Sequence, residues 1–365
     1  MKRVVVIGGG FAGALIARAL QRDFAVTLID SKDYFEFTPG ILRCLVQQEH
    51  LSKIQVRHGL YFDGDILLGK VSEVFLDCVV VDGRKIGYDY LAICSGSRYN
   101  LPFKEEIAIA GRGADVKKYY DKLRRAGKVL IIGGGIVGVE LAGEIIWKYP
   151  EKKIIIVHGR ERLMQRGIYG VSRYADDFLR RNGVEIIYNE RIVKGGKGLF
   201  FTDKNRKIEA DIGFLCTGIK ANSELLNKFT GVHDKGHIKV NSFLQLSGYD
   251  KIFVAGDANN VKEEKTAQNA EAQAGIVVWN IQNLAAGKPL IAYESKPRIM
   301  VISLGKHSGI LTRGNFVLSG RFPGWLKGWI ERRVMRRYEG YFLMHSRFLR
   351  KMFYTARRFA LRLFQ

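Results

Sequence analysis

The residues that could do chemistry in this sequence are few and far apart. Its four cysteines, at positions 44, 78, 94 and 216, show neither the CxxC spacing of a metal or redox site nor the density of a disulfide-bonded scaffold. No metal site is predicted. Asp257 follows a glycine at the end of the apolar stretch KIFVAG, where its carboxylate could bind a sugar-like polyol or act as an ordinary helix N-cap. The next stretch, EKTAQNAEAQAG, holds no nucleophile and no obvious proton relay, so its role depends on its surroundings.

A glycine-rich turn near the N-terminus is the first of the elements that must position these residues. An apolar strand leads into GGGFAG, a helical stretch ALIARAL and a second strand AVTLID that ends in an acid. This order is the fingerprint of a dinucleotide-binding unit, because the glycines let a pyrophosphate approach the helix N-terminus and the acid accepts hydrogen bonds from a ribose. The expected contacts are Gly8, Gly10, Phe11, Ala12, Gly13 and Asp30.

The same pattern recurs over residues 128–157, with Gly133, Gly135 and Gly138 in the turn, so two dinucleotides are implied. Each half then continues through a predicted hairpin into a strand that ends LAICSGS or GFLCTGI. Cys94 and Cys216 are therefore equivalent, which favours small buried residues over redox partners. The expected contacts in these later turns are Ser95, Gly96, Gly218, Gly256 and Asp257.

Over about residues 1–300 the chain resembles the two-dinucleotide-binding-domain flavoproteins of the pyridine nucleotide-disulfide oxidoreductase superfamily. Within that superfamily it is most similar to type II NADH dehydrogenases and to ferroptosis-suppressor or apoptosis-inducing-factor-like NAD(P)H:quinone reductases. The matching motifs are GGGIVGVELAGEI, FEFTPGIL, IFVAGDAN and KTAQNAEAQ. The resemblance implies that the first fingerprint binds FAD, with Asp257 on its ribityl chain, and that the second binds NAD(P)H as substrate.

The expected fold is α/β, with two Rossmann-like dinucleotide-binding domains and a C-terminal extension. Residues 1–103 and 230–297 are predicted to build the FAD domain and residues 104–229 the inserted NAD(P)H domain. Residues 298–365 form the extension, which opens with the strand RIMVISL and ends in basic amphipathic helices.

The resemblance also implies roles for residues beside the flavin. Glu140 matches a glutamate near the nicotinamide, although a carboxylate also suits the first turn of a helix without any such role. Lys265 matches lysines that lie near the flavin in some relatives, but it could simply be solvated. Ala267 and Gln268 match the AQxAxQ segment that lines the path of the quinone. The second glutamine of that motif is displaced by one position to Gln273, which turns its side chain by about 100° around a helix and leaves its role in doubt.

The choice of nicotinamide cofactor rests on the end of the strand KKIIIV. The ribose-reading position holds His158, which is followed by Arg160 and Arg162 where an acid would favour NADH. The arginines would accommodate a 2′-phosphate, so NADPH is plausible alongside NADH. Glu161 could replace the missing acid.

The electron acceptor is the next open point. Disulfide reductases of this superfamily carry two cysteines after the first acid, whereas FTPGILRCLVQQ offers only Cys44. Single-cysteine oxidases and coenzyme A disulfide reductases remain an alternative, but the apolar neighbours of Cys44 are typical of a buried helical residue. A non-enzymatic flavin-bearing redox sensor or interaction protein is a third hypothesis.

The charge of the chain points to its surroundings in the cell. The formal net charge is +23, and residues 321–365 carry 12 Lys and Arg against two Glu, together with eleven aromatic residues. One predicted helix places Trp325, Leu326, Trp329, Ile330 and Val334 near one face. A second places an apolar stripe over 348–363 opposite several arginines. Such helices are typical of a membrane interface with anionic phospholipids.

The basic tail could instead dock on protein, including a possible homodimer, or act as a nucleic-acid arm, for which no known motif is present. Because the N-terminus runs directly into a strand, no signal peptide is predicted. We therefore expect a peripheral protein on the cytoplasmic side of a membrane, without nucleic acid as partner. The expected reaction passes a hydride from NAD(P)H to FAD and two electrons on to a membrane quinone.

Overall fold

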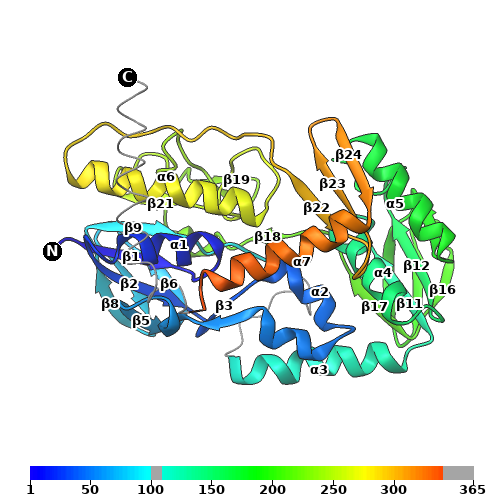
Figure 1. Ribbon diagram of the computed structural model, residues 1–365. Helices are drawn as coiled ribbons and strands as arrows, with labels where there is room; N and C mark the ends of the chain where they lie inside the picture. Colours follow the sequence, from blue (N-terminus) through cyan, green and yellow to red (C-terminus); the bar gives the residue numbers. More distant parts are fainter. Residues whose placement is uncertain (100–108, 340–365) are drawn as a thin grey trace.

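Two parallel sheets form the frame of the computed structural model, which describes residues 1–99 and 109–339 (Figure 1). The first sheet has the strand order β21-β9-β1-β2-β5, and every neighbouring pair in it is parallel. Four of the five residues of β1 are buried, as expected for a central strand that is covered on both faces. The strands are β1 (Arg3–Ile7), β2 (Ala25–Asp30), β5 (Asp65–Leu68), β9 (Tyr90–Ile93) and β21 (Ile252–Val254).

The second sheet repeats this plan with the order β13-β12-β11-β17, again all parallel. Its central strand is followed by helix α4 (Ile136–Lys148), just as β1 is followed by α1 (Phe11–Leu20). The predicted α/β fold with two Rossmann-like units is therefore confirmed, whereas the predicted domain boundaries stay a prediction. The strands are β11 (Lys128–Ile132), β12 (Lys153–His158), β13 (Glu185–Tyr188) and β17 (Ile212–Leu215).

A three-stranded antiparallel sheet is attached to each half, which confirms both predicted hairpins and extends the repeat. The first consists of β6 (Val71–Val74), β7 (Cys78–Val81) and β8 (Arg84–Gly87), and the second of β14 (Ile192–Gly196), β15 (Leu199–Thr202) and β16 (Lys207–Glu209). The shorter elements are β3 (Tyr34–Glu36), α2 (Ile41–Cys44), β4 (Gln55–Arg57), β10 (Ser97–Arg98), β18 (Lys220–Ala221), β19 (His233–Asp234) and β20 (His237–Ile238).

Three further helices complete the two halves: α3 (Ile109–Arg125), α5 (Tyr169–Arg181) and α6 (Ala267–Ala285). Helix α6 lies beside α1 above the first sheet (Figure 1). Its N-cap is Thr266, whose side chain accepts a hydrogen bond from the backbone of Asn269. The interpretation of Asp257 as an N-cap is therefore wrong, because a loop separates that residue from the helix.

The C-terminal extension opens with a predicted strand, now β22 (Met300–Ser303), which pairs with β23 (Gly309–Arg313), itself paired with β24 (Phe316–Gly320), in an antiparallel sheet. Helix α7 (Arg321–Arg336) follows and confirms the first of the two predicted basic helices. The second predicted stripe, over 348–363, lies outside the described residues.

Helix α7 crosses the middle of the molecule, between the two parallel sheets (Figure 1). The predicted apolar face of this helix is divided between two environments. Val334 is buried against the protein, whereas Trp325 and Trp329 are 56% and 38% exposed. The single apolar face expected from sequence is thus wrong in part, because one side of the helix is needed to dock the extension on its own chain. No helix within residues 1–99 and 109–339 is both long and apolar enough to cross a bilayer.

Candidate functional site

The first glycine-rich turn has the backbone geometry that a bound pyrophosphate needs. Gly8 has a φ of +91°, and a Cβ there would lie 2.3 Å from the Cys94 carbonyl oxygen. A Cβ on Gly13 would lie 1.8 Å from the Gly8 oxygen, so helix α1 packs directly on the turn. Gly10 has open space on the side where a Cβ would stand. Two glycines therefore close the turn, and the third leaves room for a ligand at the helix N-terminus.

Asp30 lies at the end of β2 and reaches back to this turn. Its Oδ2 accepts a hydrogen bond of 2.7 Å from the backbone of Gly9 and one of 3.3 Å from His58 Nε2. Burial alone would raise the pKa of the Asp30 carboxyl, but the hydrogen bond from His58 and the charge of Lys32 lower it. The result is an oriented carboxylate of the kind that accepts hydrogen bonds from ribose hydroxyls.

Of the neighbouring residues of the fingerprint, Ala12 lies in the core and Phe11 packs against it. Ala12 is buried, and Phe11 makes edge-on contacts with Phe35 and Phe37, whose ring centroids lie 5.1 and 5.7 Å away. These contacts fix the start of α1 against the segment that follows β2. They place Phe11 and Ala12 at the turn, where the sequence predicts dinucleotide contacts.

The second turn repeats the geometry of the first. Gly133 has a φ of +113° and approaches the Cys216 carbonyl, with a hypothetical Cβ 2.5 Å from its oxygen. A Cβ on Gly138 would lie 2.0 Å from the Gly133 oxygen, and Gly135 again has open space where a Cβ would stand. A second dinucleotide therefore fits here for the same physical reasons.

Turns after the central strands complete both halves. Gly96 and Gly218 adopt positive φ values of +64° and +110° with open space where a Cβ would stand. Ser95 Oγ donates to the Asn222 carbonyl oxygen and ties the two halves together. Asp257 Oδ2 accepts a 2.6 Å hydrogen bond from Ser97 Oγ, which holds this carboxylate near the turn that follows β9.

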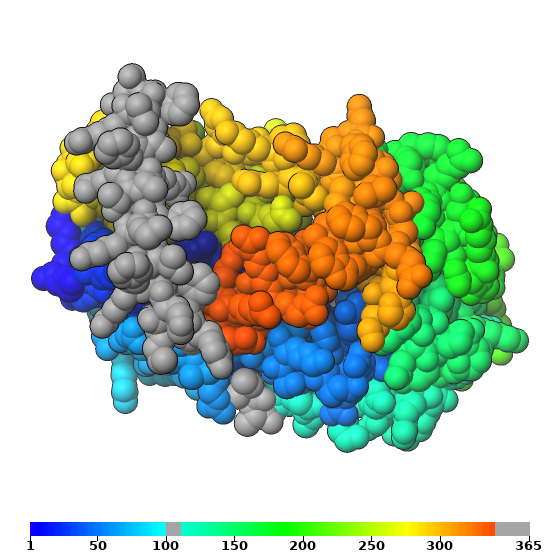
Figure 2. Space-filling model, in the orientation of Figure 1, coloured from blue at the N-terminus to red at the C-terminus, as the bar shows by residue number. Residues whose placement is uncertain are grey.

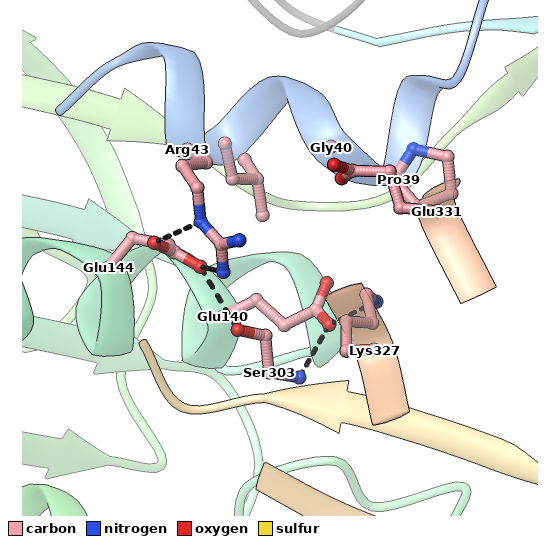
Figure 3. Close-up of a pocket in the computed structure, with 9 residues that line it drawn as sticks. Pro39, Gly40, Arg43, Glu140, Glu144, Ser303, Lys327 and Glu331 are labelled. Carbon is pink, nitrogen blue, oxygen red and sulfur yellow. Dashed lines mark hydrogen bonds and ion pairs between the residues drawn. The ribbon is translucent and has the colours of Figure 1, made fainter. Parts of the chain in front are cut away.

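A pocket lies where the two halves meet the C-terminal extension (Figure 3). Its charged groups come from α2, α4 and α7, so no single segment could build it. Arg43 makes two hydrogen bonds of 3.2 and 2.9 Å to the carboxylate of Glu144, which also accepts from Ser303 Oγ. The lining residues are Pro39, Gly40, Leu42, Arg43, Glu140, Glu144, Ser303, Lys327 and Glu331.

Glu140 lies in this pocket and is buried. Its Oε1 accepts a 2.8 Å hydrogen bond from the backbone of Ser303 and forms a 2.8 Å ion pair with Lys327 Nζ. Lys327 also donates to the Val301 carbonyl oxygen. Sequence reasoning missed Lys327 because 187 positions separate it from Glu140, and nothing in a run of tail arginines marks one lysine as inward-facing.

The start of α6 places the predicted lysine and glutamines in different environments. Lys265 Nζ donates to the backbone of Asn259 and Val261, and burial lowers its pKa. Ala267 is the first residue of the helix. Gln268 is exposed and donates to the Ile299 carbonyl oxygen at 3.0 Å. The helix thus directs Gln268 toward the C-terminal extension.

Gln273, whose role the sequence left in doubt, is 1% exposed. Its Oε1 accepts from the backbone of Gly256 at 2.7 Å and from Asn259 Nδ2 at 2.6 Å, while its Nε2 donates to Glu263. The side chain therefore fixes the turn that carries Asp257. This accounts for a glutamine at this position without a direct contact to a substrate.

The cysteines are separate and unpaired in the described part of the chain. Cys44 is fully buried, and burial raises the pKa of its thiol well above the usual value. Burial also raises the pKa of both Cys94 and Cys216 to about 12. These thiols stay protonated at neutral pH, which disfavours thiolate chemistry.

At the end of β12, the imidazole of His158 is held under the second turn. Its Nδ1 accepts a 3.1 Å hydrogen bond from the backbone of Gly134. Burial lowers the pKa of His158, with a smaller contribution from the charge of Arg160. Arg160 itself is exposed beside this strand end.

Two Rossmann-like units, each with an open glycine turn at a helix N-terminus, define a protein that binds two dinucleotides. The sequence matches the pyridine nucleotide-disulphide oxidoreductase family over residues 2–274. The chain belongs to this family, and it is an NAD(P)H-dependent oxidoreductase with FAD as cofactor.

Individual relatives cover most of the chain. It is 32% identical over 330 residues to ferroptosis suppressor protein 1 of Taeniopygia guttata, an alignment that covers 84% of this chain and 87% of the relative. It is 32% identical over 344 residues to apoptosis-inducing factor homolog A of Dictyostelium discoideum, covering 85% and 84%. The fold is similar to the sulfide:quinone oxidoreductase of Aquifex aeolicus, with a TM-score of 0.81, 19% identity and coverage of 93% and 92%. It is also similar to NDH2 of Plasmodium falciparum in complex with NADH, with a TM-score of 0.79, 16% identity and coverage of 95% and 99%.

Proposed function

We propose that this enzyme passes a hydride from NAD(P)H to FAD and two electrons from the flavin to a quinone dissolved in a membrane. The observation that carries the proposal is the position of α7. This helix contributes Lys327 to the interior pocket and exposes tryptophans and arginines on its outer side. The enzyme's interior and a surface suited to lipid thus lie on one short element.

When bound, FAD would supply the redox chemistry, as an acceptor of a hydride and a donor of electrons. The residues of this chain bind and align. Asp30 and the open side of Gly10 would hold the adenosine and diphosphate of FAD, and Asp257 would hold its ribityl chain. The equivalent turn at Gly135 would hold the diphosphate of NAD(P)H.

The pocket at Glu140 is the proposed meeting point of nicotinamide, flavin and acceptor. Ser303 and Lys327 both donate to Oε1 of Glu140, which restricts the position of its carboxylate. A fixed carboxylate can orient a nearby ring without the cost of ordering it during the reaction. We assign Gln268 to the wall of the quinone path, where an uncharged amide can hydrogen-bond a carbonyl and still leave room for an apolar tail.

The state of the cysteines supports a quinone over a disulfide as acceptor. Cys44 is the single cysteine of the segment after Asp30, and its buried thiol hydrogen-bonds only weakly, at 3.8 Å, to the Gly40 carbonyl oxygen. A buried thiol with a raised pKa is a poor nucleophile. A structurally similar protein is named as a sulfide:quinone oxidoreductase, so quinone chemistry is compatible with this fold.

The outer side of α7 supports a membrane as the location of the acceptor. Phe322 and Trp325 stack with ring centroids 6.0 Å apart, and the Arg333 guanidinium lies 5.0 Å from the centre of the Trp329 ring. The helix lies open at the front of the molecule (Figure 2). Tryptophans beside arginines are typical of helices that sit in the headgroup region of an anionic bilayer.

A spectroscopic experiment tests the electron path. The purified protein should carry a flavin whose absorbance is bleached by NADPH or NADH without oxygen and restored by a ubiquinone or menaquinone analogue. Fast bleaching of the flavin with no reoxidation by any quinone would refute a quinone as the electron acceptor. Cys44→Ser should leave quinone turnover unchanged, whereas loss of turnover would favour the single-cysteine alternative.

A second experiment tests the membrane contact separately. The full-length protein should bind vesicles that contain anionic phospholipid, and the double variant Trp325→Ser, Trp329→Ser should bind them less. Leu76→Ser, at an exposed leucine on the loop before β7, is the matched control and should bind as the wild type. Equal binding by all three proteins would refute α7 as the contact.

A further inference from the structure

The two halves of the protein hold their ribose-reading side chains in the same way. In the first half the backbone of Gly9 donates to Asp30 Oδ2 at 2.7 Å. In the second half the backbone of Gly134 donates to His158 Nδ1 at 3.1 Å. Both side chains end the second strand of their sheet, and both are held by the second glycine of the turn. His158 is therefore the positional counterpart of Asp30.

The polarity of this position is reversed between the halves. Because Nδ1 of His158 accepts a hydrogen bond, the ring hydrogen of the neutral imidazole must be on Nε2. No acceptor lone pair is left for a ribose hydroxyl. Nε2 is buried without a well-formed hydrogen bond among the described residues, with the backbone of Arg162 near the ring. Asp30, in contrast, is a carboxylate with two acceptor oxygens.

Cationic groups gather at the same strand end. Arg160 and Arg191 are both exposed, and neither forms an ion pair with a carboxylate within residues 1–99 and 109–339. Arg191 packs beside the residue after His158, since a Cβ on Gly159 would lie 2.8 Å from its Nε. A guanidinium binds phosphate with two parallel hydrogen bonds and stays charged at every physiological pH.

We infer that His158, Arg160 and Arg191 select a nucleotide with a 2′-phosphate, so that NADPH is preferred over NADH. A ribose 2′-hydroxyl would need an acceptor that His158 cannot offer, whereas a 2′-phosphate is itself an acceptor and an anion. The inference deepens the proposed function by naming the electron donor. It depends on the second dinucleotide site but not on the quinone.

Direct binding to the FAD-loaded, full-length protein tests the inference without any electron transfer. The probes are 2′,5′-ADP and 5′-AMP, which differ only in the 2′-phosphate. The wild type should bind 2′,5′-ADP more tightly, by about tenfold or more for charge-assisted phosphate contacts. Arg160→Ala and Arg191→Ala should each weaken 2′,5′-ADP by about tenfold and leave 5′-AMP unchanged.

His158→Asp supplies the missing acceptor and a charge that repels phosphate, so it should reverse the preference toward 5′-AMP. Arg181→Ala is the matched control. Arg181 is also an exposed arginine, but it ends α5 just before β13 begins. It therefore lies near the N-terminal ends of the parallel strands, whereas His158 lies at their C-terminal ends. Equal binding of the two probes by the wild type would overturn the inference. So would a preference for 5′-AMP that Glu161→Gln abolishes, because Glu161 would then be the acceptor.

Discussion

Replacing Gln273 by leucine should destabilise the turn that carries Asp257, even though the side chain touches no predicted substrate. Leucine has a similar volume, so the change removes hydrogen bonds more than packing. The lost acceptor, Oε1, serves the backbone N–H of Gly256 and one N–H of Asn259. Asn259 is fully buried and cannot turn to water.

The magnitude follows from these two donors. Each buried donor that loses its partner costs about 1–3 kcal/mol. The second amide N–H of Asn259 keeps its bond to the Val254 carbonyl oxygen, and Glu263 keeps hydrogen bonds from Tyr293 and Ser295. We therefore expect a loss of about 3 kcal/mol in the free energy of unfolding, which arises almost entirely from the two orphaned N–H groups.

Thermal release of the flavin is a suitable assay, because flavin fluorescence rises when the site opens. A loss of this size should lower the release temperature by roughly 5–10 °C. Gln268→Leu is the matched control, since that glutamine is exposed and makes one hydrogen bond. It should change the free energy of unfolding by no more than an ordinary surface substitution does, about 0.5 kcal/mol, so the release temperature should stay close to that of the wild type. Quinone turnover should nevertheless fall.

Each of the two variants has a result that would refute the reasoning. A Gln273→Leu protein with the release temperature of the wild type would mean that the buried N–H groups find other partners. Normal quinone turnover by Gln268→Leu would remove Gln268 from the wall of the quinone path.

Three other predictions concern contacts in the site. Gly10→Ala should fold but bind FAD weakly, because its Cβ would occupy the open side of the turn, whereas Gly13→Ala should not fold, because its Cβ would lie 1.8 Å from the Gly8 oxygen. Circular dichroism reports whether each variant folds, and flavin content reports whether it binds FAD. Normal flavin content in Gly10→Ala would contradict the first prediction. Lys327→Met should lower the free energy of unfolding by about 3–5 kcal/mol, because the buried carboxylate of Glu140 would lose its ion-pair partner. Urea unfolding measures this loss, and a value below about 1 kcal/mol would mean that water screens the ion pair. Cys44 should resist iodoacetamide in the native protein from pH 7 to 9, because burial raises its pKa and the reactive thiolate is scarce below that pKa; labelling in urea is the control, and fast native labelling at pH 7 would indicate a reactive thiol.

The two Rossmann-like units and their glycine turns could be predicted from the amino-acid sequence alone. The reason is that these features are local: a strand, a turn with positive φ and a helix follow one another within about thirty residues. Gly8 and Gly133 adopt positive φ values of +91° and +113°, which glycine reaches without steric cost. The repeat between the halves could also be read directly, because equivalent residues recur in the same order.

The contacts between distant groups depend on the packing of the whole chain and could not be predicted from local patterns. The ion pair between Glu140 and Lys327 joins segments 187 positions apart, and no local pattern encodes it. The two glutamines of the α6 segment point to opposite environments, which the sequence could express only as a displaced motif. The same holds for α7, whose amphipathic pattern predicted a helix but not which apolar side chains the protein itself would bury. Periodicity records that a face is apolar, whereas the partner that covers it is set by the packing of the whole chain.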